Sequence, residues 1–181
     1  MAWIGERYKG GFVSLLVWGL LSGCSVKAVP APQAQIDKLT TLLANKHSGI
    51  PREETRRLSH AIFQKTESLT REFALTSPPL WHNVLVNTGV KKRGLCYHWS
   101  DALYIFLKKE HYPHYGFHLM GANIHEYFSE HNALAVVAKG QKVEDGVIID
   151  PWRNSGKLYF SKIKVDKAYH WIHRAKRGCG P

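Results

Sequence analysis

The sequence lacks a hydrophobic run long enough to cross a membrane. Its most apolar stretch, Phe12 to Leu21, is interrupted by Ser14 and Gly19. That stretch has about half the length that a helix needs to span a bilayer. We therefore expect no permanent transmembrane helix.

Long runs of one charge and sequence repeats are also missing. The chain has 181 residues, 44% of them hydrophobic, and a formal net charge of +11. No basic run is longer than Lys91 to Arg93, and no nucleic-acid-binding motif accompanies it. We expect one globular domain with no specific nucleic-acid partner. The basic balance suits anionic lipid or an acidic polymer.

The first residues have the pattern of an export signal. Arg7 and Lys9 precede the short apolar run, and small residues close it. The closing Leu21-Ser-Gly-Cys24 resembles the lipobox of bacterial lipoproteins, in which the cysteine becomes the lipidated first residue. This resemblance implies a signal peptide at 1–23 and a lipid on Cys24. Ser25 then favours the outer membrane of a Gram-negative cell, facing the periplasm. A plain secretory signal with a coincidental cysteine is the alternative.

Hydrophobic periodicity divides the rest into helices followed by strands. Residues 24–35 hold two prolines and few bulky apolar side chains, so we expect a flexible tether before a single domain at 36–181. Helical spacing predicts helices at 34–45, from 51 to about 73, from about 80 to 87, and from 95 or 96 to about 110. Strands are predicted at 115–124, 131–139, 146–150, 157–165 and 168–175. This order indicates an α+β fold with a mostly antiparallel sheet.

Three segments of this pattern place reactive side chains at the ends of elements. Cys96 opens a helix, His131 opens a strand, and Asp150 ends the next strand. A helix N-terminus and a nearby imidazole both favour a thiolate, which is the nucleophilic form of cysteine. An aspartate on the other ring nitrogen holds the imidazole in one tautomer. Together they form a nucleophile, a base and an orienting group.

These residues resemble the transglutaminase-like branch of the papain-like superfamily. There a Gly-x-Cys opens a helix, a His begins a strand and an Asp, often followed by Pro, ends the next. Gly94-Leu-Cys96, His131 and Asp150-Pro151 fit these positions over about a third of the chain. The resemblance implies a papain-like α+β core and a Cys-His-Asp site for acyl transfer. Its members include peptidases, amidases, crosslinking acyltransferases and inactive proteins.

The group that stabilises the oxyanion is not evident from the sequence. Papain-like enzymes use the amide of the nucleophile together with one side chain, and no Gln precedes Cys96 at the usual place. We take Asn87 as the candidate, with three alternatives: His82, Asn83 and the indole N–H of Trp152.

Other roles for the same residues stay open. Cys96 could be a buried structural thiol, or it could form a disulfide with Cys179 if Cys24 is lipidated. His98 competes with His131 as the base, and Asp101 and Glu130 compete with Asp150. The chain has 11 histidines, but those at 111, 114, 118, 125 and 131 lack the spacing of a zinc site, and we expect no metal and no cofactor.

We therefore expect a monomeric, lipid-anchored envelope protein with a Cys96-His131-Asp150 site. Its substrate would be a peptide or another amide, and its reaction either hydrolysis or transglutamination. The alternative is an inactive lipoprotein that uses the same fold as a binding module.

Overall fold

The computed structural model describes residues 24–44, 49–126 and 129–174. Within these ranges the four α-helices precede the five strands of the main sheet, which confirms the α+β prediction. The four α-helices are α2 (Gln33–Ala44), α3 (Arg52–Glu72), α4 (Pro79–Asn87) and α5 (Cys96–Lys109). None of the helices in the described ranges combines the length and the hydrophobicity required to span a membrane.

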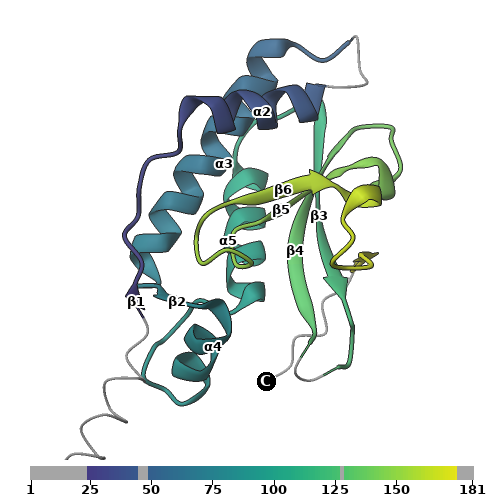
Figure 1. Cartoon of the computed structure of the whole chain (residues 1–181). Helices are drawn as coiled ribbons and strands as arrows, with labels where there is room; N and C mark the ends of the chain where they lie inside the picture. Colours follow the sequence, from purple (N-terminus) through teal and green to yellow (C-terminus); the bar gives the residue numbers. More distant parts are fainter. Residues whose placement is uncertain (1–23, 45–48, 127–128, 175–181) are drawn as a thin grey trace, which may run out of the picture.

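A five-stranded antiparallel sheet forms the other layer (Figure 1). Its strands are β3 (Tyr115–Ala122), β4 (His131–Ala138), β5 (Val147–Asp150), β6 (Tyr159–Lys162) and β7 (Ile172–His173), in the order β6-β5-β4-β3-β7. β4 is the central strand, and seven of its eight residues are buried. Side chains at both of its ends are therefore held by neighbouring strands.

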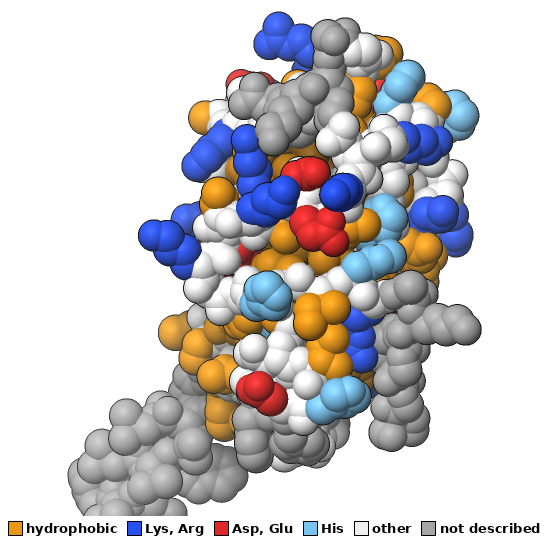
Figure 2. Space-filling view, turned by 90° about the vertical axis from the view of Figure 1, so that its right-hand side faces the viewer, with side chains coloured by type: hydrophobic (Ala, Val, Ile, Leu, Met, Phe, Trp, Pro, Cys, Tyr) orange, Lys and Arg blue, Asp and Glu red, His pale blue; other side chains and the backbone are white. Residues whose placement is uncertain are grey.

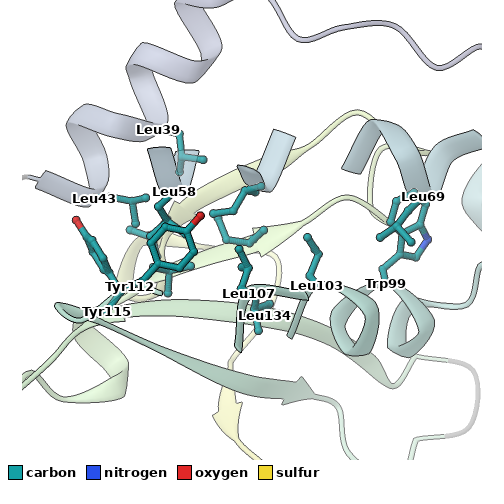
Figure 3. Packing of buried hydrophobic residues seen from close by; sticks show 14 of the residues in the cluster. Leu39, Leu43, Leu58, Leu69, Trp99, Leu103, Leu107, Tyr112, Tyr115 and Leu134 are labelled. Carbon is teal, nitrogen blue, oxygen red and sulfur yellow. The ribbon is translucent and has the colours of Figure 1, made fainter. Parts of the chain in front are cut away.

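The main hydrophobic core lies between the helices and one face of the sheet. Leu134 of β4 contributes to it, as do Trp99 and Leu103 of α5 (Figure 3). These side chains are almost fully buried. Burial of this apolar surface provides the main stabilisation of the domain and fixes α5 against β4.

The C-terminal segment covers part of the opposite face of the sheet. Alternate residues of β4, such as Ala133 and Ala135, point to this side, as their period of two requires. Ile163, in the short 3₁₀ helix η2 (Ile163–Val165), and Trp171 complete this second cluster. The sheet is thus enclosed on both faces near the start of β4.

The last two predicted strands are only partly formed in the structure. The expected strand at 157–165 is β6 followed by η2, and only Ile172–His173 of 168–175 pairs as β7. Asp166 explains the break between them, because its carboxylate accepts a hydrogen bond from the backbone N–H of Ala168 and turns the chain there. The connection between β4 and β5 contains the 3₁₀ helix η1 (Val143–Asp145).

The N-terminal end of the described chain pairs with the loop before α4. β1 (Cys24–Ser25) and β2 (Thr76–Ser77) form a two-stranded antiparallel sheet, and the N–H of Val26 donates to the carbonyl of Leu75. α2 begins at Gln33, inside the range 24–35 that was expected as a tether. The signal region at 1–23 and Cys179 lie outside the described residues.

Candidate active site

Cys96 is the first residue of α5, and the turn before it is fixed by local hydrogen bonds. Gly94 has a φ of +127°, which favours glycine. Nδ1 of His98 accepts the backbone N–H groups of Gly94 and Leu95, each at 3.1 Å. The indole N–H of Trp99 donates to the carbonyl of Gly94 at 3.1 Å. Side chains in the first turn of α5 thus hold the thiol in place, and His98 is used in this turn.

His82 of α4 also stabilises the turn before α5. Its Nδ1 accepts the N–H of Thr76 at 3.1 Å, so the ring proton lies on Nε2, which donates to the carbonyl of Arg93 at 2.9 Å. Burial lowers the pKa of His82 and keeps the ring neutral. A Cβ on Gly94 would lie 2.1 Å from His82 Nε2. The glycine predicted before Cys96 is therefore required by close packing as well as by its φ.

His131 and Asp150 are joined across β4 and β5. Leu134 pairs with Ile149, which places Asp150 opposite Ala133 and leaves His131 two residues further along the same face. His131 Nε2 lies 2.7 Å from Asp150 Oδ2, and both side chains are almost completely buried. This contact directs the other ring nitrogen, Nδ1, away from the carboxylate.

The thiol of Cys96 lies close enough to the imidazole of His131 to affect its pKa. Among the described residues, Nδ1 of His131 has no hydrogen-bond partner. Interaction with the Cys96 thiol is among the causes that raise the pKa of His131. Cys96 carries a free thiol. Asn132, the next residue of β4, donates from Nδ2 to Sγ at 3.7 Å.

The charges around His131 favour its protonated form. Burial lowers the pKa of the ring, but the hydrogen bond to Asp150, the negative charge of Asp150 and the neighbouring Cys96 outweigh it and raise the pKa to about 9. The ring is therefore an imidazolium at neutral pH. A cation at this position stabilises a neighbouring thiolate.

Arg153 and the C-terminal segment form a supporting shell that sequence reasoning missed. Arg153 donates from its backbone N–H and from Nε to Asp150, and its two terminal nitrogens bind Asp166 at 3.1 and 2.7 Å. Trp171 Nε1 also donates to Asp166. The guanidinium lies over the ring of Tyr169, at 4.8 Å from its centroid. No motif in the sequence indicates that these residues meet.

Aromatic rings surround the imidazole of His131 on its remaining sides. The centroids of Tyr169, Trp152 and Trp171 lie 4.6, 4.7 and 5.4 Å from that of His131. They exclude water from the ring and keep it in one orientation. A pocket of about 530 Å³ opens beside them. Its lining comprises Pro78, Pro79, Leu80, Asn83, Asn123, Ser129, Glu130, His131, Trp152, Arg153, Ala168 and Tyr169.

The structure places the candidate oxyanion donors in different surroundings. Asn87 is exposed and is the last residue of α4. Oδ1 of Asn83 accepts a hydrogen bond from the indole N–H of Trp152 at 3.0 Å, so these two candidates are hydrogen-bonded to each other. Both ring nitrogens of His82 contact backbone groups. The side-chain amide that donates to the Cys96 sulfur belongs to Asn132. Asn132 follows His131 in the sequence, but no sequence motif marks it as a functional residue.

The remaining predicted candidates lie elsewhere. Cys24 is exposed in β1, and Glu130 forms an ion pair with Arg174 at 2.6 Å. His114 contacts Glu54, and His118 contacts His173. In the part of the chain that the structure describes, no three His, Cys, Asp or Glu side chains are grouped closely enough to hold a metal ion.

Comparisons with protein-family models, with curated proteins and with solved structures give no significant match to this chain.

Proposed function

We propose that this chain is a thiol acyl-transfer enzyme with a papain-like core of the transglutaminase type. The observation that carries the proposal is the buried contact between His131 and Asp150, at 2.7 Å, beside the free thiol that begins α5. In this assignment Cys96 is the nucleophile, His131 transfers the proton and Asp150 orients His131. The substrate is a peptide or another amide.

The first half of the reaction forms a thioester. The Cys96 thiolate attacks the substrate carbonyl carbon, and the C=O π electrons move onto the oxygen. When this oxyanion collapses, the C–N bond breaks and Nδ1–H of His131 gives its proton to the leaving amine. Asp150 stays ionised and holds Nε2 throughout, as orienting aspartates do.

The second half releases the acyl group. A water molecule, or a second amine, approaches the thioester and gives a proton to Nδ1 of His131 as it attacks. Collapse of the new tetrahedral intermediate breaks the C–S bond and returns the thiolate beside an imidazolium. Water yields hydrolysis and an amine yields transglutamination. The pocket beside His131, lined partly by Leu80 and Trp152, is where the acyl or amine portion would bind.

One observation favours the second candidate, a binding module without catalysis. Cys96 is only 8% exposed, and the pocket is lined by His131 but not by Cys96. A substrate carbonyl would then need a small movement of the pocket wall to reach the sulfur. In this alternative the pocket would bind a ligand, and Cys96 would be a structural thiol.

An acylation experiment separates the two functions. The full chain is mixed with p-nitrophenyl acetate, and mass spectrometry of its peptides locates any acetyl thioester. We expect acetylation of Cys96 with release of one nitrophenolate per chain, loss of both in Cys96→Ala, and slow acetylation in His131→Gln. Cys179→Ala is the matched control and should react normally. Acetylation that persists in Cys96→Ala but disappears in Cys179→Ala would refute the nucleophile.

The same proposal places the enzyme in the cell envelope, anchored by a lipid on Cys24. Its support is the lipobox-like Leu21-Ser-Gly-Cys24 and the exposure of Cys24. A basic surface suits anionic lipid or an acidic envelope polymer, and several Lys and Arg side chains lie on the upper part of the face seen in Figure 2, among hydrophobic, His and a few acidic side chains. Labelling with radioactive palmitate should modify the wild-type protein and fail with Cys24→Ala. Equal labelling of both would refute the anchor.

A further inference from the structure

Arg174 determines which end of the Asn132 amide faces the Cys96 sulfur. Oδ1 of Asn132 accepts a hydrogen bond from Nη1 of Arg174 at 3.1 Å, and Nδ2 donates toward Sγ at 3.7 Å. A guanidinium can only donate, so it selects the oxygen end of the amide. The two N–H groups of the amide are thereby left on the side of the sulfur.

Arg174 is itself held by three further contacts. Its Nη1 binds Oε1 of Glu130 at 2.6 Å, and its backbone N–H donates to the carbonyl of Leu119 at 2.9 Å. Its aliphatic part passes over Gly121, where an added Cβ would lie only 2.6 Å from Cδ of Arg174. The sequence thus provides both a partner charge and the space for this side chain. These contacts leave the Asn132 amide with one preferred orientation.

Because the site is buried, the hydrogen bond from Asn132 Nδ2 is important for a negatively charged Cys96 sulfur. Asn132 is 5% exposed and Cys96 is 8% exposed, so water provides little of the solvation that a thiolate needs. A hydrogen bond to the charged form of a buried group stabilises that form. The amide acts from the α5 side of the sheet, because Asn132 alternates with His131 along β4. The sulfur is therefore approached by two side chains from opposite faces of one strand end.

We propose that Asn132 is a catalytic residue that stabilises the thiolate of Cys96, and that Arg174 is the positioning residue that orients its amide. The inference rests on the proposed function in treating Cys96 as the reacting group. It extends the site to a residue outside the predicted nucleophile, base and orienting group, and it gives the C-terminal segment a role in the reactivity of the thiol.

The test is a pH titration of the Cys96 thiolate by ultraviolet absorbance. Each full-length protein is measured against the same protein carrying Cys96→Ala, so that other thiols and tyrosines cancel. Asn132→Asp keeps an oxygen for Arg174 but removes the donor, and Asn132→Ala removes both. We expect the curve to move to higher pH by about one unit in Asn132→Ala, and further in Asn132→Asp because of the added negative charge.

Variants of Arg174 test its positioning role. Arg174→Met should move the curve upward by about half a unit, because the amide is then free to turn. Arg174→Lys retains a donor for Oδ1 and should restore most of the wild-type curve. The matched control, Arg56→Met, removes an exposed arginine of α3 that pairs with Glu53, and should leave the curve unchanged.

Unchanged curves in both Asn132 variants, with cooperative unfolding showing that they are folded, would overturn the assignment of Asn132. A shift in the Asn132 variants without one in Arg174→Met would overturn the role of Arg174. The titration needs no substrate, so it is separate from the acylation experiment. A chain that shows the Asn132-dependent shift but forms no thioester would refute only the acyl-transfer function. A thioester formed without any shift would refute only this inference.

Discussion

Arg153 encloses the carboxylate of Asp150 from two directions. Its backbone N–H contacts Oδ1 at 3.2 Å and its Nε contacts Oδ2 at 2.9 Å. Asp150 also accepts a hydrogen bond from His131. The buried negative charge of Asp150 is therefore compensated by both Arg153 and His131. Asp150 is therefore held by Arg153 independently of its contact with His131.

Replacing Arg153 by Met should destabilise the domain strongly. The change leaves two buried carboxylates, those of Asp150 and Asp166, without their common cation, and breaking such a pair costs about 3–5 kcal/mol. The free energy of unfolding in urea measures this loss. Arg71→Met, at an exposed ion pair of α3 with Glu67, is the control and should change stability by about 0.5 kcal/mol or less. Equal effects would show that the buried network contributes no special stability.

The pH dependence of stability should report the ionisation of His131. Its pKa is about 9 in the folded protein and about 6.5 when unfolded, so the folded state binds more protons between these values. The stabilisation is fully present below about pH 6.5 and is lost as the pH rises through about 9, by roughly 3 kcal/mol.

The measurement for this prediction compares unfolding of the wild type and His131→Gln from about pH 6 to about pH 10. The difference between the two proteins should shrink over this range. Cys96→Ala should weaken the trend, because the thiol contributes to the raised pKa of His131. A difference that stays constant with pH would refute the ion pair between His131 and Asp150.

The glycine before the thiol provides a prediction with a close internal control. Gly94→Ala should destabilise the fold by about 3 kcal/mol, because the new Cβ meets His82 and the φ is positive. Gly89 also has a positive φ, of +77°, but open space around its Cβ position. Gly89→Ala should therefore cost only about 1 kcal/mol. Thermal or urea unfolding compares the two, and similar losses would show that the His82 contact is not tight.

The pair of histidines between β3 and β7 should make the docking of β7 sensitive to acid. Burial and the neighbouring His173 and Lys108 lower the pKa of His118, so the folded state favours its neutral form. This contribution is present above the unfolded pKa of about 6.5 and is lost as the pH falls below it. We expect faster hydrogen exchange of the Arg174 N–H, which binds Leu119, in acid than at neutral pH after correction for intrinsic rates. His118→Gln should remove this excess, and an unchanged excess would refute the role of the pair.

The order of the helices and strands could be predicted from the sequence because the hydrophobic periods of helices and strands are local properties. The leucines of α3 and α5 repeat at helical spacing, and the buried run of β4 is bounded by turn residues. The proximity of His131 and Asp150 could also be predicted from the sequence, since the pairing of neighbouring antiparallel strands determines which residues lie near one another.

The supporting residues could not be found in this way because they meet through long-range contacts. Arg174 is 42 residues away from Asn132, and its place depends on how β7 docks beside β3. The partners of His82 and Asn83 likewise depend on how α4 packs against the loop before α5 and on the position of Trp152. Spacing along the chain contains no information about such packing, so Asn87 could not be distinguished from Asn132 as an amide near the thiol.

The pairing of β1 with β2 determines where a membrane would lie relative to the pocket. Cys24 and Ser25 pair with Ser77 and Thr76 across the two strands, and the next residues, Pro78 to Leu80, line the pocket. A lipid on Cys24 would thus be attached with almost no slack, at the end of the domain where α4 lies (Figure 1). Such an enzyme would reach only substrates close to the bilayer surface, and lengthening the chain between Cys24 and Val26 would extend that reach.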